Sequence, residues 1–81
     1  MTDHHLQLVT WRDAHAVTES WTHIEELDKH ECVVVSVGIV LHDVKPGYLV
    51  LAQSMIDGEH TVDHVLAIPV GMVISAVTIS A

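Results

Sequence analysis

The chain has 81 residues, of which 49% are apolar, and a formal net charge of −8. This length allows one domain, residues 1–81, and the apolar content excludes a disordered chain. Only three Lys and Arg residues are present to neutralise phosphates, so no nucleic-acid partner is expected.

The first predicted elements are a strand and a short helix. Residues 4–11 alternate imperfectly between apolar and polar side chains and predict a strand, which a loop follows. Thr22 and Glu25 then have the spacing of a helix capping box ahead of Ile24 and Leu27. They predict a helix of about two turns, which would need tertiary support.

Four further strands are predicted after this helix. The strongest pattern covers residues 32–41, where every second residue on one side is Val, Ile or Leu, and Gly38 predicts a bulge or a sharp bend. Residues 48–56, 62–70 and 72–79 follow, with a 3₁₀-like turn before the last strand. The expected fold class is therefore mainly β: a small, bent, five-stranded barrel, SH3-like or Sm-like, with one short helix between its first two strands.

The second half of the chain has little charge. From residue 32 onward the formally charged residues are Asp43, Lys45, Asp57, Glu59 and Asp63. Several strands are apolar on both faces, which is more than one small domain can hide, so we expect a homo-oligomer. No membrane association is expected, because the uncharged C-terminal run is shorter than the ~20 residues of a spanning helix and contains Pro69 and Gly71.

The sequence offers no motif for catalysis or metal binding. It has eight histidines but one cysteine, and no Cys/His quartet has the spacing of a structural zinc site. No nucleophile elbow, phosphate-binding glycine loop or H-E-x-x-H motif occurs. We therefore expect neither an enzyme nor a cofactor. A metal-binding protein or metal-dependent enzyme built on the histidines, within one chain or shared between subunits, remains an alternative.

The best candidate for a ligand-binding site lies between the two tryptophans. The candidate residues are Trp11, Arg12, Asp13, His15 and Trp21. Aromatic rings beside an arginine and a carboxylate can stack on a planar ligand or anchor a protein partner. The alternative is structural: the tryptophans cap an open end of the barrel, and Arg12 and Asp13 form an exposed pair of little energy.

Several segments together resemble a group of small proteins encoded by bacteriophages and prophages. The resemblance covers roughly residues 8–75 and rests on WRDAH, Trp21, SVGIVL, YLVLAQS and IPVGMV. Val70 departs from the group's pattern, which has a basic or polar residue after the Ile-Pro pair. The resemblance implies a viral origin and a bacterial cytoplasmic setting, and it implies no reaction.

The expected function is that of a non-enzymatic binding module that self-assembles. Its target would be a host protein or a small ligand, including a nucleotide-like signal of bacterial immunity. Trp11, Arg12, His15 and Trp21 would make the contacts with such a ligand. A structural protein of the virion or of its assembly is the alternative from a different class.

Overall fold

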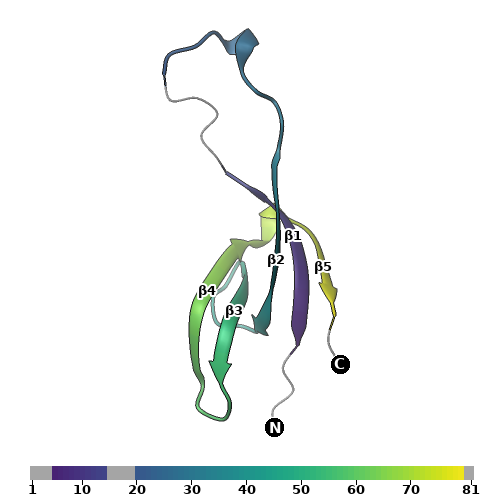
Figure 1. The fold of residues 1–81 in the computed structure, drawn as a ribbon, viewed down its shortest axis with the longest axis vertical. Coiled ribbons are helices and arrows are strands. Elements are labelled where there is room, and N and C mark those ends of the chain that lie inside the picture. Colours follow the sequence, from purple (N-terminus) through teal and green to yellow (C-terminus); the bar gives the residue numbers. More distant parts are fainter. Residues whose placement is uncertain (1–4, 15–19, 80–81) are drawn as a thin grey trace.

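The protein folds as one antiparallel sheet of five strands (Figure 1). The structure, a computed structural model, describes residues 5–14 and 20–79. The strands are β1 (Leu6–Asp13), β2 (Cys32–Leu41), β3 (Tyr48–Ile56), β4 (Thr61–Pro69) and β5 (Val73–Thr78), in the spatial order β4-β3-β2-β1-β5. Two 3₁₀ turns, η1 (Ile24–Glu26) and η2 (Val70–Met72), complete the described elements. The mainly β fold with five strands is thus confirmed.

The segment between β1 and β2 differs from its prediction. Within residues 20–31 the only helical structure is the three-residue turn η1, so the two-turn helix is not confirmed. The Thr22 hydroxyl donates to the Glu26 carboxylate at 3.4 Å, and the N-cap residue His23 makes no side-chain capping bond. All of residues 20–31 are exposed, so this segment lacks the tertiary support that a helix of this length requires.

The main cluster of buried side chains lies on one face of the bent sheet, which we call the inner face. Val50 and Ala52 of β3 are also buried, but they alternate with Leu51 and belong to the opposite face. Val9, Leu51 and Ile68, from three different strands, are at most 3% exposed. Four partly buried side chains pack against them: Trp11, Val40, Leu49 and Val73. The antiparallel registers pair Leu49 with Ile68 and Trp11 with Val73, which places these side chains on one side. The opposite side is the outer face.

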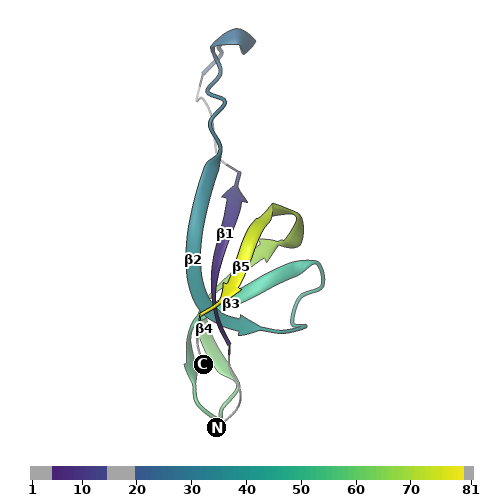
Figure 2. The same ribbon diagram turned by 90° about the vertical axis from the view of Figure 1, so that its right-hand side faces the viewer.

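Strand β2 belongs to both halves of the sheet and changes partner after Gly38. Its first seven residues pair only with β1, Ile39 pairs with both β1 and β3, and Val40 and Leu41 pair with β3. Gly38 is buried, and a Cβ at this position would lie 2.9 Å from the Leu51 Cβ. The glycine therefore permits a close approach of β2 to β3 where the sheet bends (Figure 2). The only register shift in the described strands lies elsewhere, between Thr10 and Trp11 where β1 meets β5.

The sheet is open among the described residues. The turn η2 joins β4 to β5, as the 3₁₀-like turn in the sequence predicted. The Val70 N–H donates to the Gly47 carbonyl at 3.0 Å and fixes this corner against the β2–β3 loop. However, β4 and β5 are the two ends of the strand order and do not pair with each other, so closure into a barrel is not confirmed.

The molecule is elongated, with principal extents of 55 × 21 × 20 Å. Its radius of gyration is 16.2 Å, whereas a compact domain of this length has about 12 Å. The β1–β2 ribbon extends beyond the other strands, and η1 lies at the far end of the long axis (Figures 1 and 2). Within the described ranges, no helix has both the length and the apolar character needed to cross a membrane.

Candidate functional site

Trp11, a predicted ligand contact, lies on the inner face. It packs against the core cluster, and its indole N–H donates to the Ser36 hydroxyl at 3.1 Å. Ser36 is on β2, and Trp11 lies opposite Val34, which precedes Ser36 by two residues and shares its face of the strand. A partly buried indole whose N–H is already bonded is held in place by the fold. In this position Trp11 joins the two strands of the ribbon.

Arg12 and Asp13, the next two predicted contacts, point to different faces because adjacent strand residues alternate. The Arg12 Nε donates to a Glu31 carboxylate oxygen at 3.0 Å, with the two side chains 50% and 59% exposed. An ion pair this exposed contributes about 0–1 kcal/mol. Asp13 ends β1 opposite Cys32 and is exposed. The Arg12–Glu31 pair ties the end of β1 to the residue that precedes β2.

Trp21 has a relative exposure of 103%, so no described residue covers its ring. It lines an open hollow of about 260 Å³ together with Thr22, His23 and Glu26. His15, the remaining predicted contact, lies outside the described residues. The structure therefore does not bring Trp11, Arg12 and Trp21 into one pocket of a single chain. Trp21 is the member of the predicted set that is presented to solvent.

Residues 20–31, which we call the projecting loop, combine exposed apolar side chains with acidic ones. Ile24 is 78% exposed and Leu27 is 36% exposed. The loop has four carboxylates and one lysine: Glu25, Glu26, Asp28, Glu31 and Lys29. The predicted contacts do not include Ile24 and Leu27, which the sequence assigns to the two-turn helix. The segment forms only the short turn η1 and is exposed throughout, so the two side chains add to the exposed apolar residues of the loop.

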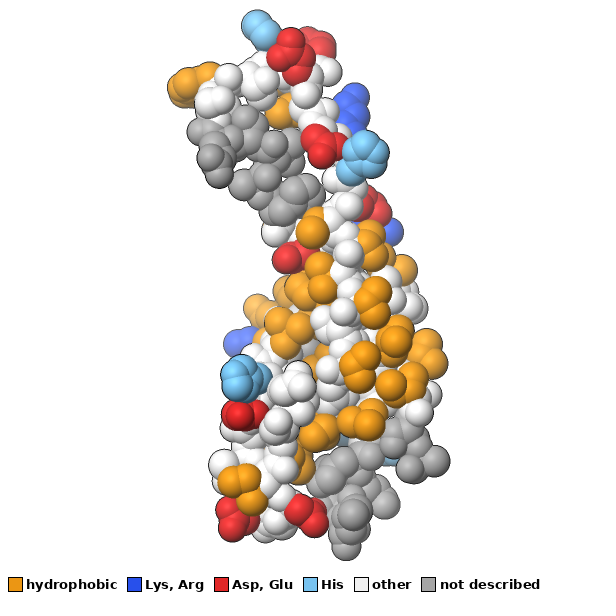
Figure 3. Space-filling model, in the orientation of Figure 1, with side chains coloured by type: hydrophobic (Ala, Val, Ile, Leu, Met, Phe, Trp, Pro, Cys, Tyr) orange, Lys and Arg blue, Asp and Glu red, His pale blue; other side chains and the backbone are white. Residues whose placement is uncertain are grey.

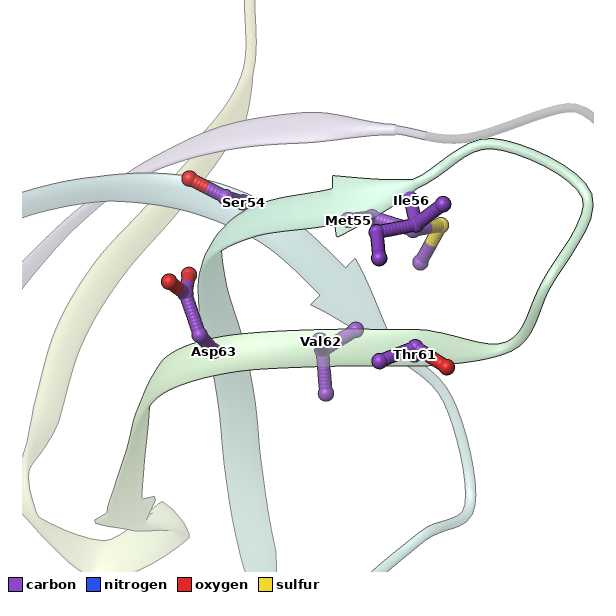
Figure 4. Close-up of a pocket in the computed structure, with 6 residues that line it drawn as sticks. All are labelled: Ser54, Met55, Ile56, Thr61, Val62 and Asp63. Atoms are coloured by element: carbon purple, nitrogen blue, oxygen red, sulfur yellow. The ribbon is translucent and has the colours of Figure 1, made fainter.

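A second hollow lies at the β3–β4 hairpin (Figure 4). It has a volume of about 160 Å³ and is lined by Ser54, Met55, Ile56, Thr61, Val62 and Asp63. Ser54 and Asp63 are cross-strand partners and lie together at one end of the hollow, away from the apolar side chains. Sites for small organic ligands usually measure about 300–1,000 Å³. This hollow is too small for such a ligand.

Several of the described histidines form close pairs, at separate places in the structure. The rings of His5 and His42 meet edge to face with centroids 6.1 Å apart. The His30 Nδ1 lies 2.6 Å from an Asp28 carboxylate oxygen. No group of three or more His, Cys, Asp or Glu side chains that could hold a metal ion occurs in residues 5–14 and 20–79. A single chain therefore gives the histidine-based metal alternative no support over these residues.

We compared the chain with protein-family models, curated proteins and solved structures, and none of them matches it.

The different surroundings of the two tryptophans predict different fluorescence. Trp11→Phe leaves Trp21 as the only tryptophan, and we expect its emission to be red-shifted and strongly quenched by acrylamide. Trp21→Phe leaves the partly buried Trp11, whose emission should be blue-shifted and weakly quenched. Steady-state spectra of the two variants in dilute buffer measure this difference. Quenching that is equally weak in the two variants would show that the Trp21 ring is covered in solution.

Proposed function

We propose that this protein is a non-enzymatic binding module that self-associates and captures a host protein through its projecting loop. The sequence resemblance supports a phage-encoded protein that acts in the bacterial cytoplasm. In this role the sheet is a scaffold for the loop, and the chemistry is recognition without bond making or breaking.

The observation that carries the proposal is the uncovered indole of Trp21 at the far end of an elongated molecule. Burial of an aromatic ring of this size is among the most favourable contributions to a protein interface, and tryptophan is enriched at interface hot spots. Ile24, in the same loop, is a second apolar side chain that is largely exposed. An indole in water makes no such contribution to the chain's own fold, so a binding partner best explains its position.

The charge of the loop favours a polypeptide partner over an anionic ligand. The loop has four carboxylates and one lysine in addition to its apolar side chains, and Arg12 at the base of the loop is already paired with Glu31. An apolar pocket with a basic rim would complement this surface, whereas a nucleotide phosphate would be repelled. Self-association would present several loops at once and would increase avidity without new contacts.

A pull-down from bacterial lysate tests the proposal. We expect the wild-type chain to retain a specific host protein that Trp21→Ala loses. Val44→Ala is the matched control, because Val44 is 59% exposed in the β2–β3 loop and lies outside the projecting loop. Retention by the Trp21→Ala variant equal to that of the wild type would rule out the loop as the recognition element.

Related measurements would detect the two other functions, binding of a small ligand and a structural role in the virion or its assembly. Calorimetric titration with a nucleotide panel would detect the small-ligand function. Nucleotide binding that requires Trp21 would show that the loop binds a small ligand and not a host protein. Copurification in large assemblies with virion proteins would favour the structural function instead. We expect neither result, because the acidic loop opposes anions and the exposed indole is suited to a discrete partner.

A further inference from the structure

The N-terminal half of β2 has an open edge. Residues 32–38 pair with β1 on one side, and β3 begins to pair with β2 only at Ile39. No other described strand pairs with this half of β2. A strand edge of this kind presents unpaired N–H and C=O groups that can bind another strand.

The alternation of hydrogen bonds along β2 identifies the residues whose backbone N–H and C=O groups face away from β1. The Val40 N–H donates to the His5 carbonyl at 2.8 Å, so β2 residues of even number face β1. The intervening residues face the other way, as the pairing of Ile39 with Ala52 of β3 illustrates. Val33, Val35 and Val37 therefore direct their backbone N–H and C=O groups to the open edge.

The side chains of the same three valines lie on the outer face and are largely exposed. Val33, Val35 and Val37 are 50%, 60% and 51% exposed, respectively. Hydrophobic side chains gather over β1, β2 and β5 in the space-filling view (Figure 3). Natural sheets protect such edges with charges, prolines or bulges. Residues 32–41 contain no charge and no proline, and the described registers of β2 contain no shift.

We propose that the open edge of β2 binds the same edge of a second copy, antiparallel and centred on Val35. This inference rests on the self-association in the proposed function and specifies its surface. Val35 then lies opposite Val35 of the partner subunit, and Val33 lies opposite Val37 of the partner subunit. Each edge is used once, so the assembly closes as a twofold dimer with a continuous β1-β2-β2-β1 sheet.

The exposed surface area favours a second copy as the occupant, and the charge of the chain does not prevent it. The chain exposes 6344 Å², whereas a compact monomer of 8.9 kDa exposes about 4,800 Å². The excess of about 1,500 Å² is more than the roughly 800 Å² that one partner buries in a standard interface. Two copies at −8 each repel, but the proposed register separates their Glu31 residues by about 25 Å, beyond the Debye length.

Among the described strands, the sheet has two other open edges, on β4 and on β5. The β4 edge is less suited to pairing with a second copy, and the β5 edge is a rival that can be tested. On β4, Asp63 carries a charge and His64 has a φ of 47°, both of which disturb regular pairing. On β5 the Ile79 N–H donates to the Leu6 carbonyl at 2.9 Å, so the odd-numbered residues of β5 face β1. The N–H of the even-numbered Ala76 therefore faces away from β1. Ala76 and Val35 are thus equivalent positions on two different edges.

Proline substitution at these two positions tests the proposal. Val35→Pro removes an outward N–H without removing an intrachain ladder bond, as proline is tolerated at strand edges. We expect the wild type, Ala76→Pro and Val35→Thr to sediment as dimers, and Val35→Pro to sediment as a monomer. The expected increase in the dimer Kd for Val35→Pro is at least about tenfold. Circular dichroism of each variant confirms that the sheet is retained.

Amide exchange of the wild type gives a test that needs no variant. At high protein concentration the Val33, Val35 and Val37 amides should be protected, and on dilution they should exchange while Val34 stays protected by β1. A Val35→Pro dimer, or fast exchange at these valines in the wild-type dimer, would overturn the β2 edge but leave self-association standing. A wild type that is monomeric at micromolar concentration would overturn self-association itself, and the loop's partner would still be tested by the pull-down.

Discussion

Ile68→Ala should reduce the free energy of unfolding by about 2–5 kcal/mol, because it leaves a cavity in a thin core. Ile68 is 0% exposed and packs with Val9 and Leu51, the other two members of the buried cluster. A domain of this size has a total stability of roughly 4–12 kcal/mol, so a large fraction of it would be lost. Urea unfolding at a fixed protomer concentration measures the change.

Val44→Ala is the matched control for this core substitution. It also removes methyl groups, but from a side chain that is 59% exposed, and it should change the free energy of unfolding by no more than about 0.5 kcal/mol. Ile68→Val should fall between the two, at about 0.5–1.5 kcal/mol. If Ile68→Ala and Val44→Ala had equal effects, the core would have to lie elsewhere.

Gly38→Ala should destabilise the fold by about 1–3 kcal/mol through overpacking. The added Cβ would lie 2.9 Å from the Leu51 Cβ and 3.0 Å from the Ala52 carbonyl oxygen. Neither atom is the free end of a flexible side chain, so the backbones of β2 and β3 must separate. Thermal unfolding measures the effect, and Gly38→Val should lower the Tm further.

Gly71→Ala is expected to change the stability in the opposite direction. A Cβ at Gly71 would have nothing within 4 Å, and the residue has no positive φ. The substitution restricts the unfolded chain and should stabilise the protein by up to about 1 kcal/mol. If both glycine variants changed the Tm by the same amount, steric contact at Gly38 would not be the cause.

The sequence predicted the strands well because their signals are local. Residues 32–41 and 48–56 match β2 and β3 in full, since long apolar runs of β-branched residues end at clear turn residues. The bend at Gly38 follows from a glycine inside such a run. Which side of β2 faces the core was not predictable from apolar content, because the more apolar side, with Val33, Val35 and Val37, is the exposed one.

The helix and the barrel closure depend on contacts that a local pattern does not specify. Thr22 and Glu25 have capping-box spacing, but a helix of two turns forms only when another element covers it, and nothing in the described structure covers residues 20–31. Closure requires β4 to pair with β5, which is decided by the path of the chain through η2. Neither requirement is encoded in a single short segment.

The predicted ligand site joined residues that are close in sequence but differ in environment. Trp11 and Arg12 are neighbours, so in a strand they face opposite sides. The sequence could have separated them if β1 had been extended to Asp13, as the β1–β2 register shows. Exposure of Trp21 was not foreseeable, because it depends on the absence of cover over the whole loop.

The pairing of β1 with β5 has a consequence for synthesis in the cell. Gln7 lies opposite Thr78, so β1 obtains one of its two neighbours only after β2, β3 and β4 have been synthesised. Until then Val9 has no strand on that side, although β1 can already pair with β2. Nascent chains and C-terminally truncated products should therefore be the forms that chaperones hold and proteases remove.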